Sequence, residues 1–147
     1  MGVLHSVLPL DKSCAEWLDQ ECVPHPDPTA DYRYPTPKEI TSALQQIGDY
    51  LVDLNADSSS GEWMATITEA KSTTGAWASL RVSDYSSDEE PHEFYFPKGC
   101  PEVIFTVVER IAHYCGPLVV VDDSSVRPII VSPNDSIQKL LRDYEGA

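Results

Sequence analysis

The chain has 147 residues, and its 24 acidic and 10 basic side chains give a formal net charge of −14. A field of this sign repels phosphates and anionic lipids, which argues against direct binding to nucleic acid or to a membrane surface. No apolar run approaches the ~20 residues of a membrane-spanning helix. The length suits one unit with its own hydrophobic core, so we expect a single globular domain over residues 1–147.

The first ten residues are apolar but lack the basic start and the small-residue cleavage site of a secretory signal. We therefore expect a cytoplasmic location, where cysteines stay reduced. No two cysteines form a C-x-x-C pair, and without a secretory signal we expect reduced, mostly buried thiols rather than a disulfide framework. The four cysteines are Cys14, Cys22, Cys100 and Cys115.

Two helices are predicted before any strand of the central region. A capping-box pattern that begins at Ser13 predicts a short helix running to about Cys22. Residues 23–35 contain four prolines and predict an ordered surface loop. A second capping box begins at Thr36, and the amphipathic helix that follows is predicted to end at Gly48 in a left-handed cap.

From residue 50 onward, apolar residues recur at every second position, which indicates strands with one buried face. The short polar segment at 71–75 separates two of these strands and is typical of a hairpin connection. The predicted strands cover residues 50–55, 63–70, 76–83 and 92–96.

The strongest helix signal begins at Pro101, where a broad apolar stripe continues to Cys115. The uninterrupted apolar run 118–121 predicts a central strand covered on both faces. A further strand is predicted over 129–131, followed by a helix capped within 132–135.

Strands dominate the middle of the chain and helices flank them, which favours an α+β fold over an alternating parallel one. We expect a mainly antiparallel sheet of about five to six strands with three to four helices packed around it. A short strand near the N-terminus would add to the sheet. Residues 92–121 could alternatively form one right-handed strand–helix–strand unit.

Motifs for phosphate cradles, nucleophile elbows and zinc sites are absent from the sequence. We accordingly expect no cofactor and no metal. The segment around His92 contains Glu89, Glu90 and Glu93, a set that could bind a cation, although glutamate loops are more often simply solvated. The simpler interpretation is an exposed acidic loop.

Cys100 is the one candidate nucleophile, because a helix beginning at Pro101 would favour its thiolate. His92 is the only imidazole that could serve as its base, and no oxyanion motif accompanies the pair. Asp122 and Asp123 follow a predicted buried strand and are an alternative acid–base pair, although a polar turn explains them more simply. A packing or capping role for Cys100 is favoured.

Two predicted loops combine carboxylates with tyrosines. Tyrosine rings supply buried contact area and carboxylates supply charge complementarity, a composition suited to a basic protein partner. We expect these groups to gather on one side of the surface. The predicted partner-binding residues are Asp84, Tyr85, Asp88, Glu89 and Glu90 in one loop and Asp31, Tyr32 and Tyr34 in the other.

Small size, strong acidity and the lack of a catalytic motif resemble the immunity proteins that neutralise bacterial toxins. The resemblance implies a non-enzymatic, stoichiometric inhibitor that occupies the active cleft of a basic toxin domain, such as a nuclease. Three alternatives remain: a small thiol- or carboxylate-dependent enzyme, an acidic mimic of nucleic acid that occupies a DNA-binding protein, and an accessory domain.

Overall fold

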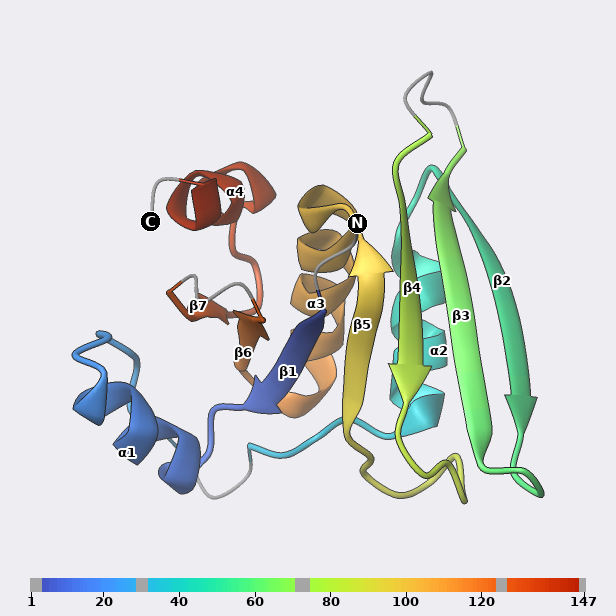
Figure 1. Ribbon diagram of the computed structural model, residues 1–147, viewed down its shortest axis with the longest axis horizontal. Helices are drawn as coiled ribbons and strands as arrows, with labels where there is room; N and C mark the ends of the chain where they lie inside the picture. Colours follow the sequence, from blue (N-terminus) through green and yellow to red (C-terminus); the bar gives the residue numbers. More distant parts are fainter. Residues whose placement is uncertain (1–3, 29–31, 71–74, 124–126, 146–147) are drawn as a thin grey trace.

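A computed structural model describes residues 4–28, 32–70, 75–123 and 127–145. Within these ranges the chain forms seven strands and four helices (Figure 1). The strands are β1 (His5–Pro9), β2 (Tyr50–Asp57), β3 (Glu62–Glu69), β4 (Trp77–Val82), β5 (Phe94–Gly99), β6 (Leu118–Asp122) and β7 (Ile129–Val131). The helices are α1 (Lys12–Gln20), α2 (Pro37–Gln46), α3 (Pro101–Cys115) and α4 (Ile137–Glu145). The predicted α+β class is confirmed, with more strands than the five to six expected.

All seven strands belong to one sheet in the order β2-β3-β4-β5-β1-β6-β7, and each neighbouring pair is antiparallel. The N-terminal strand β1 lies between β5 and β6: His5 pairs with Phe96 on one side and with Asp122 on the other. Since both neighbours run antiparallel to β1, they are parallel to each other. The predicted strand–helix–strand unit therefore exists in split form, because α3 connects β5 to β6 across β1.

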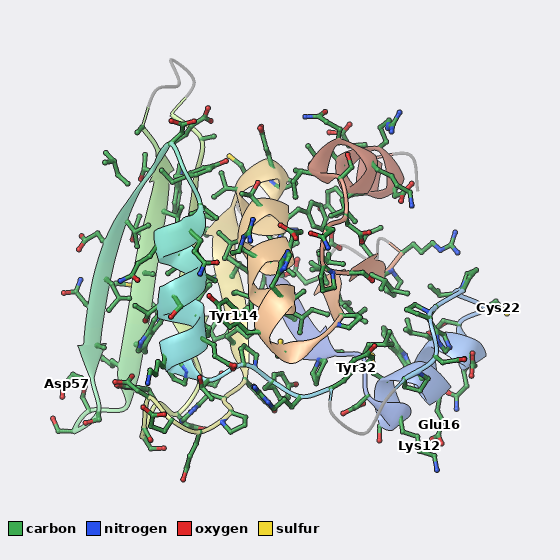
Figure 2. The ribbon with its side chains drawn as sticks, turned by 180° about the vertical axis from the view of Figure 1, so that it is seen from behind. Lys12, Glu16, Cys22, Tyr32, Asp57 and Tyr114 are labelled. Carbon is green, nitrogen blue, oxygen red and sulfur yellow. The ribbon has the colours of Figure 1, made fainter. Side chains whose placement is uncertain are left out.

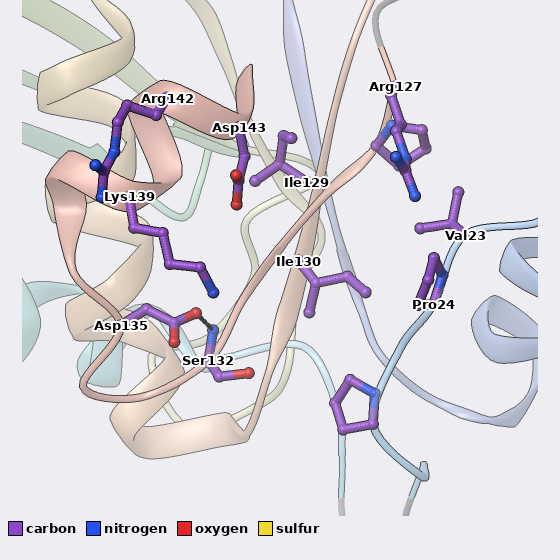
Figure 3. Close-up of a pocket in the computed structure, with 12 residues that line it drawn as sticks. Val23, Pro24, Arg127, Ile129, Ile130, Ser132, Asp135, Lys139, Arg142 and Asp143 are labelled. Atoms are coloured by element: carbon purple, nitrogen blue, oxygen red, sulfur yellow. Dashed lines mark hydrogen bonds between the residues drawn. The ribbon is translucent and has the colours of Figure 1, made fainter. Parts of the chain in front are cut away.

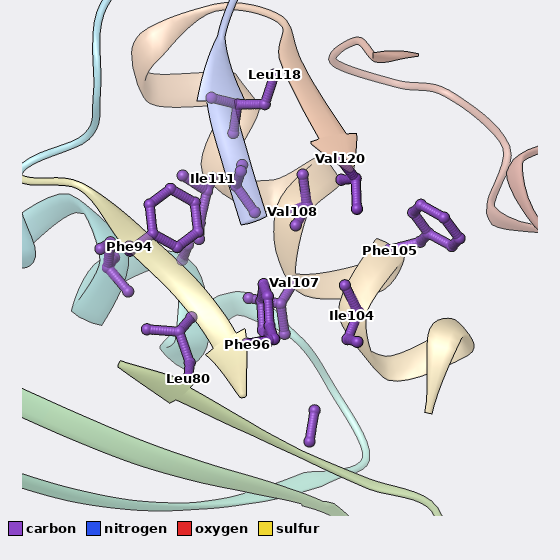
Figure 4. Packing of buried hydrophobic residues seen from close by; sticks show 14 of the residues in the cluster. Leu80, Phe94, Phe96, Ile104, Phe105, Val107, Val108, Ile111, Leu118 and Val120 are labelled. Atoms are coloured by element: carbon purple, nitrogen blue, oxygen red, sulfur yellow. The ribbon is translucent and has the colours of Figure 1, made fainter. Parts of the chain in front are cut away.

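The main hydrophobic core lies between one face of the sheet and helices α2 and α3. The alternating faces predicted for β3 and β4 are confirmed, since Ala65, Ile67, Ala78 and Leu80 are fully buried. Helix α3 presents its predicted stripe to this layer (Figure 4), and its fully buried side chains include Val103, Ile104, Phe105, Val107, Val108 and Ile111.

A second, smaller core lies on the opposite face of the sheet, where α1 packs against β1, β6 and β7. Leu10 and Leu18 are fully buried in it together with Val119. Val120, the next residue of β6, points into the main core instead. Strand β6 is therefore covered on both faces, as its continuous apolar run predicted.

The ends of α1 and α2 differ from the prediction in two places. Asp11, rather than Ser13, is the N-cap of α1, since its carboxylate accepts a hydrogen bond from the Cys14 backbone N–H at 2.9 Å. After α2, Asp49 rather than Gly48 adopts the left-handed conformation, with φ of 64°. Aspartate tolerates this region better than most residues, so glycine was not required there.

The capping box of α2 is confirmed: the Glu39 N–H donates to Thr36 Oγ1 at 3.1 Å, and the Thr36 N–H donates to Glu39 Oε1 at 2.9 Å. At α4 the cap lies one residue later than predicted. Ser136 Oγ accepts from the Lys139 N–H at 3.3 Å, whereas Asp135 closes the preceding turn.

Helix α4 is fastened to the sheet through a buried polar contact. The Tyr144 hydroxyl donates to Asp122 Oδ2 at 2.6 Å, and His5 Nε2 lies 3.4 Å from the same hydroxyl oxygen. The Tyr144 ring also meets Phe105 edge-on, with centroids 5.6 Å apart. Burial, followed by the hydrogen bond to Asp122, raises the pKa of Tyr144 to about 12. The contact joins helix α4 to the neighbouring strands β1 and β6.

Tyr144→Phe should destabilise the protein by about 1–3 kcal/mol, because Asp122 is buried and loses a hydrogen-bond donor. Urea unfolding at neutral pH measures this loss. Tyr95→Phe is the control, since Tyr95 lies at the half-exposed sheet surface, and it should change stability by less than about 0.5 kcal/mol.

The difference in stability between wild type and Tyr144→Phe should depend on pH. A folded pKa above the ordinary value of 10 means that the native state keeps a proton that the unfolded state releases. The contribution of Tyr144 is therefore complete below about pH 10 and is lost as pH rises toward 12. The stability difference between wild type and Tyr144→Phe should shrink over this interval; a constant difference would contradict the assignment.

Candidate functional site

Two turns that are distant in sequence meet at one end of the sheet. The turn between β2 and β3 follows Asp57, whose carboxylate accepts from the Ser59 N–H at 3.0 Å. The connection from β4 to β5, residues 83–93, lies beside it, because the Tyr85 N–H donates to the Gly61 carbonyl at 3.2 Å. Both turns lie at the lower end of β2, β3 and β4 in Figure 1.

Exposed carboxylates concentrate at this end of the sheet. Among the described residues, these carboxylates form one ion pair, which joins Glu89 to Lys38 Nζ at 3.5 Å. Most of these carboxylates thus form no ion pair with a described residue, although Arg81 lines the same cavity as Glu62 and Asp84. We call this surface the acidic end, and it consists of Asp57, Glu62, Asp84, Asp88, Glu89, Glu90 and Glu93.

Tyr85, predicted to contact a partner, instead anchors the 83–93 loop. It is 8% exposed, and its hydroxyl donates to Asp88 Oδ1 at 2.7 Å. His92 is also buried, and it contacts the Glu90 carbonyl through Nδ1 at 2.6 Å. Its Nε2 accepts from the Ser86 N–H at 3.3 Å. Both rings are buried and hold the loop, Tyr85 through the Asp88 carboxylate, while Asp84, Glu89 and Glu90 are exposed.

The end of the proline-rich loop joins the acidic end. The His92 N–H donates to the Pro35 carbonyl at 3.1 Å, and the Lys38 N–H donates to the Asp88 carbonyl at 3.1 Å. Tyr34 is half-buried next to this junction; burial raises its pKa, and the charge of Glu93 raises it further. Of the two described residues predicted in this loop, Tyr32 and Tyr34, Tyr34 is the one that the structure brings to the acidic end.

Tyr32 lies elsewhere, against the second core. A Cβ added to Gly116 would come within 2.4 Å of Tyr32 Cδ1, so the ring rests directly on that glycine. Figure 2 shows Tyr32 near α1 and Asp57 at the far edge of the sheet. The prediction that Tyr32 and the 83–93 loop share one surface is therefore wrong. Asp31 lies outside the described residues.

A cavity of about 470 Å³ borders the acidic end. Met64 pairs with Arg81, and Arg81 pairs with Tyr95, so the three side chains share one face of β3, β4 and β5. Glu62 and Asp84 lie at the rim of the same cavity. Sequence reasoning missed Met64, Arg81 and Tyr95, although strand alternation already marked them as positions opposite the buried face.

This cavity opens on a sheet face that neither hydrophobic core includes. In Figure 1 this face of the sheet is turned toward the viewer, with α2 and α3 behind the sheet. The strand register aligns Leu51, Thr68 and Trp77 farther along the same face, and Leu51 and Trp77 are 65% and 40% exposed. Among the described residues, no helix covers this face of β2–β5.

The alternative in which Cys100 and His92 form a catalytic pair is excluded on geometric grounds, whereas the favoured packing role agrees with the contact of Cys100 with the main core. His92 precedes the first residue of β5, whereas Cys100 follows the last. The five residue steps from Phe94 to Gly99 alone span roughly 16 Å at 3.3 Å per residue. Cys100 does begin α3, as predicted, but it makes no side-chain capping hydrogen bond.

The other side chains that were candidates for catalysis or metal binding also have structural roles. Asp122 is 7% exposed and accepts the Tyr144 hydroxyl, so it does not form an open acid–base turn with Asp123. Burial raises the pKa of Cys14 to about 11 and that of Cys115 to about 12. In the part of the chain that the structure describes, no three His, Cys, Asp or Glu side chains converge as metal ligands.

The four thiols should therefore react at different rates. Cys22 is exposed and should be alkylated by iodoacetamide first, followed by half-buried Cys100. Cys14 and Cys115 should react only on unfolding, because they are buried and remain thiols at pH 8. Peptide mass spectrometry after timed labelling checks the order, and Cys22→Ser should remove the fast phase alone. Early labelling of Cys115 would contradict the packing of α3.

No protein-family model, curated protein or solved structure matches this chain. Within the described ranges, no helix combines the length and the apolar character needed to cross a bilayer.

Proposed function

We propose that this protein is a non-enzymatic binding protein whose acidic end docks on a basic protein surface. The observation that supports it most is the convergence of exposed carboxylates from two separate turns beside a partly apolar cavity. Uncompensated charge accelerates encounter with a partner of opposite sign and favours the correct orientation. The cavity could in addition hold a side chain of the partner, which charge attraction alone would not position.

An arginine or lysine of the partner fits this cavity chemically. Its aliphatic stem can pack against Met64 and Tyr95, while its charged head reaches the carboxylates of Glu62 and Asp84. The face of Tyr95 also offers a cation–π contact. Arg81 lines the same cavity and limits how many further cations it accepts. Anchors of this kind dominate the energetics of protein interfaces.

The 83–93 loop is preorganised for binding. Tyr85 and His92 hold it from inside, and backbone hydrogen bonds join it to Gly61 and Pro35. A loop that is already ordered loses little conformational entropy when a partner docks, so more of the contact energy contributes to affinity.

The partner class that we propose is a basic nucleic-acid-processing domain. Its phosphate-binding cleft is rich in Arg and Lys, and carboxylates can occupy the positions of the phosphates. Such an inhibitor would act as an immunity protein in the bacterial cytoplasm, where the target of a nuclease toxin lies. A DNA-binding regulator presents the same chemistry, and identification of the captured partner distinguishes the two.

Neutralising the acidic end should weaken partner binding at least tenfold. The partner is first captured from the native host at low ionic strength, released with salt and identified by mass spectrometry. The dissociation constant is then compared between wild type and the quadruple variant Glu62→Gln, Asp84→Asn, Glu89→Gln and Glu90→Gln, all at exposed positions.

The matched control changes the same number of charges elsewhere, with Glu16→Gln, Glu21→Gln, Glu102→Gln and Glu145→Gln, also at exposed positions. It should weaken binding less than about threefold, because distant exposed charges are screened by salt. Equal losses in both variants would show that net charge, rather than the acidic end, drives association and would refute the proposed surface.

Removing the cavity's apolar wall should accelerate dissociation. Tyr95→Ala and Met64→Ala should each increase the dissociation rate constant about tenfold or more, which corresponds to about 1.4 kcal/mol. Leu51→Ala is the control, since Leu51 is 65% exposed on the same face but does not line the cavity. An unchanged dissociation rate in both cavity variants, with folding intact by circular dichroism, would place the anchor elsewhere.

A further inference from the structure

A second cavity, of about 590 Å³, lies between α4, β7 and the loop that follows α1 (Figure 3). Its apolar lining comes from Val23 and Pro24 on one side and from Pro128 and Ile130 on the other. The volume and the mixed lining are typical of sites for small organic molecules.

Basic side chains concentrate around this cavity. Arg127, Lys139 and Arg142 line it, and they are three of the ten basic residues in a protein of net charge −14. All three are exposed, and none forms an ion pair with another described residue. In Figure 3, Lys139 extends from α4 toward Ser132, and Arg127 lies across the cavity near Pro24. The basic side chains of the cavity therefore come from two separate parts of the chain.

Two carboxylates, Asp135 and Asp143, offset part of this positive charge. Asp135 accepts from the Ser132 N–H at 2.8 Å and is thereby occupied in the turn before α4. Asp143 lines the cavity without an ion pair to a described residue. Three cations against two carboxylates leave one net positive charge, in contrast to the acidic end.

We propose that this cavity binds a small organic anion, in which a phosphate or carboxylate group is attached to an apolar body. The anionic group would bind at Lys139 of α4, with Arg142 on the same helix and Arg127 across the cavity adding positive potential, and the apolar body would cover the proline and isoleucine surface. The proposal is independent of partner binding at the acidic end, since the two sites lie on different elements and have opposite charge.

Four probes test both parts of the ligand by NMR titration: phenyl phosphate, benzoate, phenol and inorganic phosphate. At least one of the two aromatic anions should shift the backbone amide signals of Ile130 and Lys139 saturably, and comparison of the two identifies the preferred anionic group. Phenol and inorganic phosphate should bind at least tenfold more weakly. No saturable shift with either aromatic anion, or equally tight binding of phenol or of inorganic phosphate, would overturn the proposal.

Removing a positive charge from the cavity should lower the affinity for the anion, and removing a negative charge should raise it. Lys139→Gln and Arg127→Gln should each weaken binding of the preferred anion at least threefold, whereas Asp143→Asn should strengthen it about twofold or more. Lys98→Gln is the control, because Lys98 is an exposed lysine on β5 outside the cavity, and it should leave affinity unchanged. Thermal melts verify that each variant is folded.

Two outcomes would overturn this assignment. Equal losses in Lys98→Gln and Lys139→Gln would indicate general electrostatic attraction rather than a site. Concentration-dependent association of the protein in sedimentation experiments, abolished by Lys139→Gln, would show that the acidic end of a second copy occupies the cavity.

Discussion

The fold depends on the position of β1 between β5 and β6. This N-terminal strand pairs with both, so the two halves of the sheet are continuous only through it. Helix α3 crosses over β1 and seals the junction with side chains that are fully buried, including Val107 and Ile111. Truncating such a side chain removes buried apolar area and leaves a cavity, so this layer is the most sensitive part of the structure.

The two halves of the sheet are covered differently, and the proposed sites follow from that difference. Around β1, β6 and β7, helices pack on both faces: α1 on one, α3 and α4 on the other. In the part of the chain that the structure describes, helices cover one face of the β2–β5 half, and Met64, Arg81 and Tyr95 lie on the opposite face. The half that is covered on one face exposes a sheet face and a set of turns, while the other half forms a cavity between α4, β7 and the loop after α1.

Charge is also divided between these halves. Carboxylates gather at the turns of β2–β5, and three basic residues that form no ion pair with another described residue surround the cavity beside α4. Because exposed charges farther apart than about 10 Å are largely screened at physiological salt, each surface acts through its local charge rather than through the net value of −14. One protein can therefore favour a basic macromolecule at one end and a small anion at another place.

Local patterns in the sequence determined the secondary structure and the buried faces. The stripe of α3, the alternation in β3 and β4 and the capping box at Thr36 depend on neighbours a few residues away, and all are found as predicted. The tertiary structure alone decided the insertion of β1, since strand partners are chosen by contacts between distant segments. It also decided that Tyr85 turns inward and that Tyr32 rests on Gly116, because the direction of a loop side chain depends on which other segments pack against it.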